Sequence, residues 1–187
     1  LLLWNFASSA INQVGNSLLG ASYLISKAYF PRLVVPLSNL ATQLVDFAIA
    51  AVLLVPVMLW YRVVPRPSLL IAPAIVLLAT CFALGVGLWI AALNIEYRDV
   101  RIVIPWILQI AMYVTPVVYP LSALPEKYRA IATFNPMSGI VEAFRASLFG
   151  TPLPYEALGW SIVASLILLI TGAFYFRRAE RRFADVL

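Results

Sequence analysis

The chain has 187 residues, of which 63% are hydrophobic and 11% are charged, and its mean hydropathy is +0.94. This balance is typical of an integral membrane protein, and the net charge of +5 comes from basic residues scattered at loop positions, which excludes a nucleic-acid-binding face. The absence of histidine, with a single cysteine (Cys81) in an apolar run, excludes zinc chemistry and an internal disulfide.

Five apolar stretches approach the length of about 20 residues that a transmembrane helix requires. They are residues 1–19, 37–60, 69–93, 102–120 and 157–176, so the sequence predicts an all-α, polytopic membrane protein with one domain over 1–187. An odd number of spans places the two termini on opposite sides of the membrane. If the arginine-rich tail at 177–182 is cytoplasmic, eight of the thirteen basic residues, including the four of the tail, lie on the cytoplasmic side. This distribution agrees with the positive-inside rule.

The first span carries an uncharged polar face, because Asn5, Ser9, Asn12 and Asn16 recur at helical spacing. Neutral hydrogen-bonding groups suit a glycan better than an ion, whose path usually shows charged residues at depth. Hydrogen bonds between helices are an equally good interpretation of this face.

The loop after the first span combines large apolar residues with basic ones, ahead of a proline that ends any local helix. Its residues of interest are Leu24, Ile25, Lys27, Tyr29, Phe30, Pro31 and Arg32. An exposed apolar knob with a charged rim indicates a docking surface for another protein, and the alternative is an elbow that rests its aromatic rings in the lipid headgroups.

Asp46 is the only acid well inside a predicted span, and Asn39 and Gln43 share its face. A charge at the centre of a membrane helix costs about 3 kcal/mol, so Asp46 is expected to face protein or water. A proton-coupled secondary transporter would use such a carboxylate, and this is a rival function from another class.

The third span carries Ala79, Ala83, Gly87 and Ala91 at intervals of four, which places four small residues on one helical face. Small residues allow close approach of helices in lipid. We expect packing within the bundle in preference to a dimer seam.

The fourth span is rich in prolines and aromatic residues. Each proline removes a backbone donor that lipid cannot replace, so neighbouring protein or a polar cavity must satisfy the freed carbonyls. Trp106, Tyr113 and Tyr119 are candidates for a channel wall, because sugar faces stack on flat rings.

Two stretches after this span, 125–134 and 136–149, are too short to cross a bilayer and are expected to dip into it and return. Pro125 with Glu126 and Asn135 with Pro136 mark their starts, because proline suits the first helical position and asparagine caps a helix. Glu142 and Arg145 lie three residues apart, where an exposed ion pair is worth a few tenths of a kcal/mol.

No Walker A loop, GxSxG motif or paired nucleophile and base occurs in the sequence. We therefore expect no catalytic site, no metal site and no cofactor.

The order and spacing of six motifs resemble a known family. They are LISKAYFPRLVVPL at 24–37, LVDF at 44–47, LNIEYRDVR at 93–101, TPVVYPLSALPEKYR at 115–129, NPMSGIVEAFRASLFG at 135–150 and YFRRAERRFADVL at 175–187. Together they resemble the permease subunit of type 2 ABC transporters that export polysaccharide, lipopolysaccharide O-antigen or teichoic-acid precursors. The family subunit has six membrane helices after an amphipathic cytoplasmic segment, so that segment and the first helix are expected to be missing here.

The resemblance implies a homodimer in the plasma (inner) membrane, with a cytoplasmic carboxyl terminus, that moves a lipid-linked glycan outward. ATP would be used by a separate ABC ATPase subunit, which docks on the loop at about 16–36. The two short helices would form the gate at the outer mouth of the channel. A drug or lipid exporter of the same transporter class is the alternative.

Overall fold

The computed structural model describes residues 1–20, 31–62, 66–97, 99–119 and 132–183, together with Pro125 and Lys127. In chain order the helices are α1 (Leu2–Gly20), α3 (Val34–Trp60), the short 3₁₀ helix η1 (Pro67–Ile71), α4 (Ala72–Glu96), α5 (Val100–Val114), α7 (Pro136–Phe149) and α8 (Tyr155–Phe183). The described part contains no strand, so the prediction of an all-α protein is confirmed.

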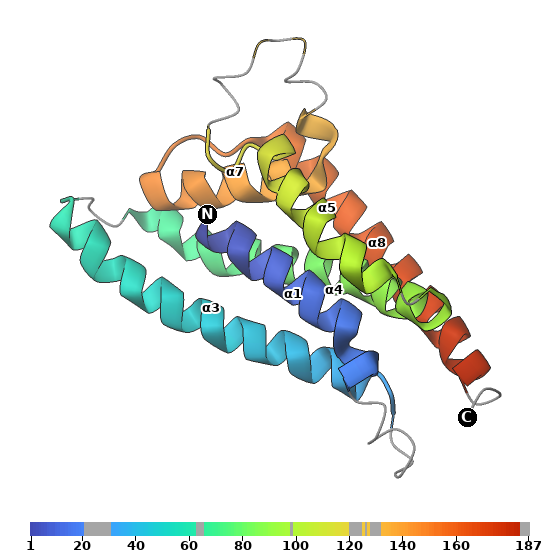
Figure 1. The fold of residues 1–187 in the computed structure, drawn as a ribbon. Helices are drawn as coiled ribbons and strands as arrows, with labels where there is room; N and C mark the ends of the chain where they lie inside the picture. Colours follow the sequence, from blue (N-terminus) through green and yellow to red (C-terminus); the bar gives the residue numbers. More distant parts are fainter. Residues whose placement is uncertain are drawn as a thin grey trace.

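The helices form a bundle in which α4 packs against both α1 and α8 (Figure 1). α7 lies across one end of the bundle and packs on α8, while α3 and α5 flank α1 on either side (Figure 1). The four small residues predicted on one face, Ala79, Ala83, Gly87 and Ala91, are all buried in α4. Gly87 lies against Val14 of α1, so this face packs within the bundle as predicted.

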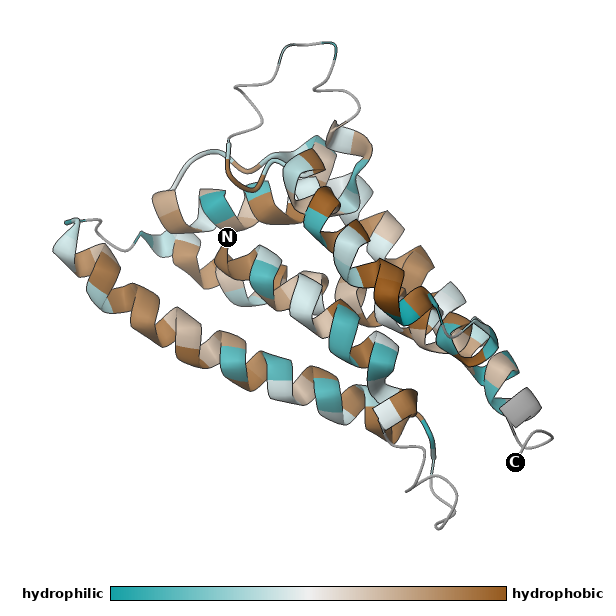
Figure 2. Ribbon diagram, in the orientation of Figure 1, coloured by the Kyte–Doolittle hydropathy of each residue, from teal (hydrophilic) through white to brown (hydrophobic). Residues whose placement is uncertain are grey.

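Three helical segments of the described chain are long and apolar enough to cross a membrane: Val34–Trp60, Pro67–Glu96 and Tyr155–Glu180. α1 has 19 residues but carries a polar face, and α5 is a shorter apolar helix of 15 residues. The exposed surfaces of α3 and α5 are largely apolar, as expected for helices that face lipid or another membrane subunit (Figure 2).

The predicted fourth span, 102–120, is wrong in its last part. α5 ends at Val114, and Thr115 is extended, with a ψ of 135°. Thr115 precedes Pro116, whose ring disfavours the helical conformation of the residue before it. The last helix is longer than the predicted span of 157–176. α8 continues past residue 176 because arginine, alanine and glutamate in the tail are strong helix formers.

The second short helix is confirmed as α7, with Pro136 in its first turn. Asn135 caps it by accepting a hydrogen bond from the backbone N–H of Met137 at 3.0 Å, as predicted. α7 ends at Gly150, whose φ of 68° is accessible to glycine without strain. Most of the first short helix, predicted at 125–134, lies outside the described residues.

Candidate functional site

The polar face of α1 lies open between α3 and α5. Asn5 and Ser9 are exposed and Asn12 is half-buried, whereas Ala7 and Ala10 on the opposite face are fully buried against the bundle. Because α1 is amphipathic in this way, its uncharged polar side chains are accessible between the flanking helices α3 and α5.

A groove of about 450 Å³ lies between α1 and α3. Its lining residues are Leu2, Asn5, Phe6, Ser9, Gln43, Asp46, Phe47 and Ala50. Asp46 accepts a hydrogen bond from Nε2 of Gln43 at 3.2 Å, and of the described residues that line the groove it alone is ionisable. Asn39 donates to the backbone carbonyl of Gln13 at 3.2 Å, which joins α3 to α1 near the groove.

A second groove, of about 280 Å³, lies between α1 and α5. Its lining residues are Trp4, Asn5, Ser8, Ser9, Asn12, Pro105, Leu108, Gln109 and Met112. The structure therefore brings the predicted residues Asn5, Ser9 and Asn12 together. It also adds Gln109, which the sequence prediction missed although it is a polar residue within an apolar helix.

The aromatic residues predicted as a channel wall do not line this groove. Trp106 and Tyr113 are 66% and 67% exposed, and they lie about a quarter of a turn around α5 from the positions that face α1. Tyr119 follows α5 and donates its hydroxyl to the backbone carbonyl of Tyr113 at 3.0 Å. Trp106 and Tyr113 therefore lie to one side of the face of α5 that meets α1.

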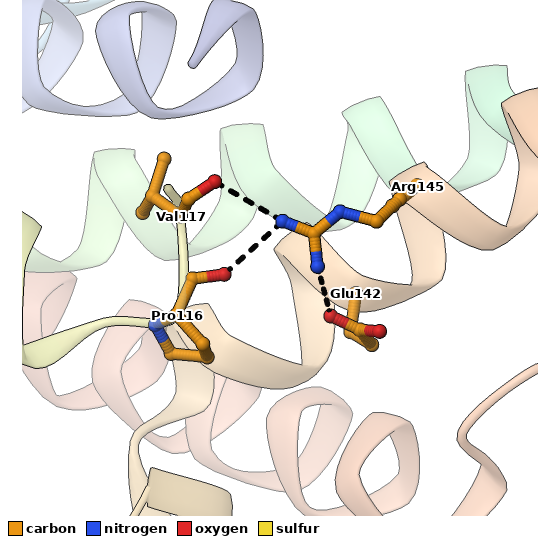
Figure 3. A network of polar contacts seen from close by, with 4 residues as sticks. All are labelled: Pro116, Val117, Glu142 and Arg145. Atoms are coloured by element: carbon orange, nitrogen blue, oxygen red, sulfur yellow. Dashed lines mark hydrogen bonds and ion pairs between the residues drawn. The ribbon is translucent and has the colours of Figure 1, made fainter. Parts of the chain in front are cut away.

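α7 holds the segment that follows α5, which we call the 115–117 turn. One guanidinium nitrogen of Arg145, Nη2, donates to the carbonyls of Pro116 and Val117 at 3.3 and 3.1 Å, while the other, Nη1, pairs with Glu142 (Figure 3). The predicted ion pair is present and partly shielded from solvent, and its arginine also donates to two backbone carbonyls.

A second contact fixes the same turn. Asn135 donates through Nδ2 to the hydroxyl of Thr115 at 2.8 Å, and Thr115 is fully buried. Of the gate residues, Asn135, Pro136, Glu142 and Arg145 are thus on or next to α7. Pro125 is exposed, and Glu126 lies outside the described residues.

Five residues of the predicted docking loop, Leu24, Ile25, Lys27, Tyr29 and Phe30, also lie outside the described residues. Pro31 is exposed at the start of the next described segment. Arg32 is half-buried and donates to the backbone carbonyl of Glu180 at 2.8 Å. The start of α3 therefore lies beside the end of α8, at the end of the bundle opposite to α7 (Figure 1). Over the described ranges, no group of three or more His, Cys, Asp or Glu side chains could hold a metal ion.

Comparison with known proteins gives one family over most of the chain: the family model described as ABC-2 type transporter matches residues 1–149. Two O-antigen export system permease proteins RfbA of Klebsiella pneumoniae are each 30% identical over 183 residues, which is 97% of this chain and 70% of theirs. An O-antigen export system permease protein RfbA of Myxococcus xanthus is 27% identical over 188 positions, which cover 99% of this chain and 72% of that protein.

Proposed function

The chain belongs to the ABC-2 type transporter family of membrane permeases, and we propose that it is the permease of an ATP-driven exporter that moves lipid-linked polysaccharide from the cytoplasm outward. The similar proteins are named as O-antigen export permeases, which supports a polysaccharide of the O-antigen, capsule or teichoic-acid type as the cargo.

The polar face of α1, open to a groove on each side, is the observation that carries the proposal. Asn5 and Ser9 line both grooves, and Asn12 and Gln109 line the one beside α5. Amides and hydroxyls both donate and accept hydrogen bonds, so they can exchange partners with successive sugar hydroxyls as a polymer moves past. An ion would require charged or closely caged ligands.

The open side of the two grooves supports the proposed homodimer. α5 buries none of its residues in this chain, although it is apolar. A second copy placed on this side would cover α5 and turn the half-open grooves into a channel.

The proposed ATPase partner would dock at the end of the bundle where α3 begins and α8 ends. The contact between Arg32 and Glu180 joins these two helices. The loop predicted at about 16–36 is shorter than expected, because α1 continues to Gly20 and α3 begins at Val34. A force applied to the segment between these helices would reach α3 and α8 together. This end would be cytoplasmic, and α7 would lie near the outer mouth as part of the gate.

A proton-coupled mechanism through Asp46 receives less support. Asp46 lines the groove between α1 and α3, but among the residues that the structure describes no second ionisable side chain lines either groove. Family membership also favours ATP as the energy source.

Deletion of this permease tests the proposed cargo. We expect undecaprenyl-linked glycan to accumulate on the inner leaflet of the membrane and surface glycan to disappear. The purified complex should contain a Walker-type ATPase, and in liposomes it should hydrolyse ATP faster when the lipid-linked glycan is added.

Normal surface glycan in the deletion strain, with retention of a small hydrophobic drug, would contradict the proposal in favour of drug export. Transport that a pH gradient drives without ATP, and that Asp46→Asn abolishes, would contradict it in favour of proton coupling.

Thiol labelling tests the proposed orientation. Lys127 and Arg178 are exposed; Lys127 lies between α5 and α7 in the sequence, and Arg178 lies in the last turn of the apolar segment Tyr155–Glu180. In a Cys81→Ala background, Lys127→Cys should react with a membrane-impermeant thiol reagent in intact cells, whereas Arg178→Cys should react only after permeabilisation. The reverse pattern would place α7 on the cytoplasmic side and remove its assignment to the outer gate.

A further inference from the structure

Three asparagines connect α4 to the polar face of α1, and we call them the asparagine relay. Asn94, buried in α4, donates through Nδ2 to the backbone carbonyl of Gly15 at 2.8 Å and to Oδ1 of Asn16 at 3.3 Å. Asn16 in turn donates through Nδ2 to the backbone carbonyl of Asn12 at 2.9 Å and to its Oδ1 at 2.6 Å.

Backbone carbonyls determine which way each amide in the relay faces. A carbonyl only accepts hydrogen bonds, so the NH₂ group of Asn94 must face Gly15 and that of Asn16 must face the carbonyl of Asn12. The side-chain oxygen of Asn12 therefore accepts from Asn16. The NH₂ group of Asn12 is left without a partner among the described residues, and Asn12 lines the groove between α1 and α5.

Packing alone is a poor explanation for Asn94. The residue is 2% exposed, and its side-chain oxygen has no hydrogen-bond partner in the described part of the chain. Both hydrogen bonds of the side chain come from its NH₂ group, so the buried amide oxygen is left without compensation. An amide at this position is therefore better explained by what its NH₂ group does to the relay.

We propose that Asn94 is a positioning residue for the exported glycan. Through Asn16 it fixes the amide of Asn12 so that the NH₂ group of Asn12 is presented to the groove. There it donates a hydrogen bond to a hydroxyl or carbonyl oxygen of a passing sugar. This inference rests on the proposed function and adds a specific donor to the path.

Glycan-stimulated ATP hydrolysis by the purified permease–ATPase complex in liposomes tests the relay. The probe is undecaprenyl-linked glycan extracted from the deletion strain, and the half-saturating glycan concentration is measured. Asn12→Leu and Asn94→Leu should each raise this concentration about five-fold, the effect of one lost hydrogen bond, at an unchanged maximal rate. Because Asn94 acts only through Asn12, the double variant should also stay at about five-fold.

Two controls separate positioning from stability. The thermal unfolding midpoint of the Asn94→Leu complex is measured in parallel, because a loss of stability alone would lower the amount of folded complex, and so the maximal rate, but not the half-saturating concentration. Gln13→Leu, on α1 but outside both grooves, should leave the half-saturating concentration unchanged. If Asn94→Leu does not assemble, Asn16→Leu interrupts the same relay within α1 and carries the same expectation.

An effect that multiplies to about 25-fold in the double variant would overturn the inference, because independent sites add their free energies. An unchanged half-saturating concentration in Asn94→Leu, with or without a loss of stability, would overturn it too. A wild-type complex that the glycan does not stimulate would instead overturn the proposed function, and the inference with it.

Discussion

Replacing Gly85 by valine is expected to prevent α4 and α8 from packing together. A Cβ atom at Gly85 would lie 2.6 Å from the backbone nitrogen of Leu169 and 2.7 Å from the backbone carbon of Leu168. Gly172 faces the same contact from α8, where a Cβ would lie 2.4 Å from the carbonyl oxygen of Gly85. Backbone atoms cannot turn aside as a side chain can, so the helices must separate.

The expected loss is at the upper end of the range for overpacked cores, about 3 kcal/mol or more, which corresponds to a fall of about 10 °C in the thermal unfolding midpoint. Gly172→Val should have the same effect. Both variants are measured by thermal unfolding of the purified protein in detergent and by its level in the membrane.

Gly159→Val is the matched control. Gly159 also lies in α8, but a Cβ there meets no atom of the described residues within 4 Å, so the variant carries the same β-branched side chain into open space. Its midpoint should stay close to that of the unmodified protein. Equal losses in Gly159→Val and Gly85→Val would show that helix propensity, and not close backbone packing, determines the effect.

Helical spacing predicted the face of α4 that packs on α1, because small residues at intervals of four are visible in one sequence segment. The contact between Gly85 and Gly172 was not predicted, since it depends on which helix lies opposite, and no periodicity within α4 contains that information. The end of α5 at Thr115 follows from a local rule, the effect of proline on the residue before it, and could have been predicted.

In the candidate site, too, features of a single helix could be predicted from the sequence, whereas contacts between helices could not. The polar face of α1 was predicted because it is a property of one helix. Asn94 was overlooked because it lies in the charged motif LNIEYRDVR, which is typical of a loop, whereas the structure buries it at the end of α4 against Gly15. Trp106 and Tyr113 were placed on the channel wall by residue type alone, and the direction from which α5 meets α1 excludes them from the groove.

Replacing Arg145 by methionine is expected to release the 115–117 turn from α7. The long apolar side chain of methionine keeps much of the packing of arginine, but it leaves Glu142 and the carbonyls of Pro116 and Val117 without their donor. Since these groups are only partly shielded from solvent, the expected loss is about 1–3 kcal/mol, less than for a fully buried pair. Under the proposed function, this contact joins the end of α5 to the gate.

Surface glycan export by the complemented deletion strain should therefore fall about five-fold or more, as expected for a loss of about 1 kcal/mol or more in a step that requires α5 and α7 to move together. Arg145→Lys should restore export only in part, because a single ammonium group cannot reach Glu142 and both carbonyls as the forked guanidinium does. Glu142→Gln should export nearly normally, since Arg145 keeps its two carbonyl partners and a neutral acceptor. Normal export in Arg145→Met, with the variant present at the usual level in the membrane, would show that the turn and α7 work independently.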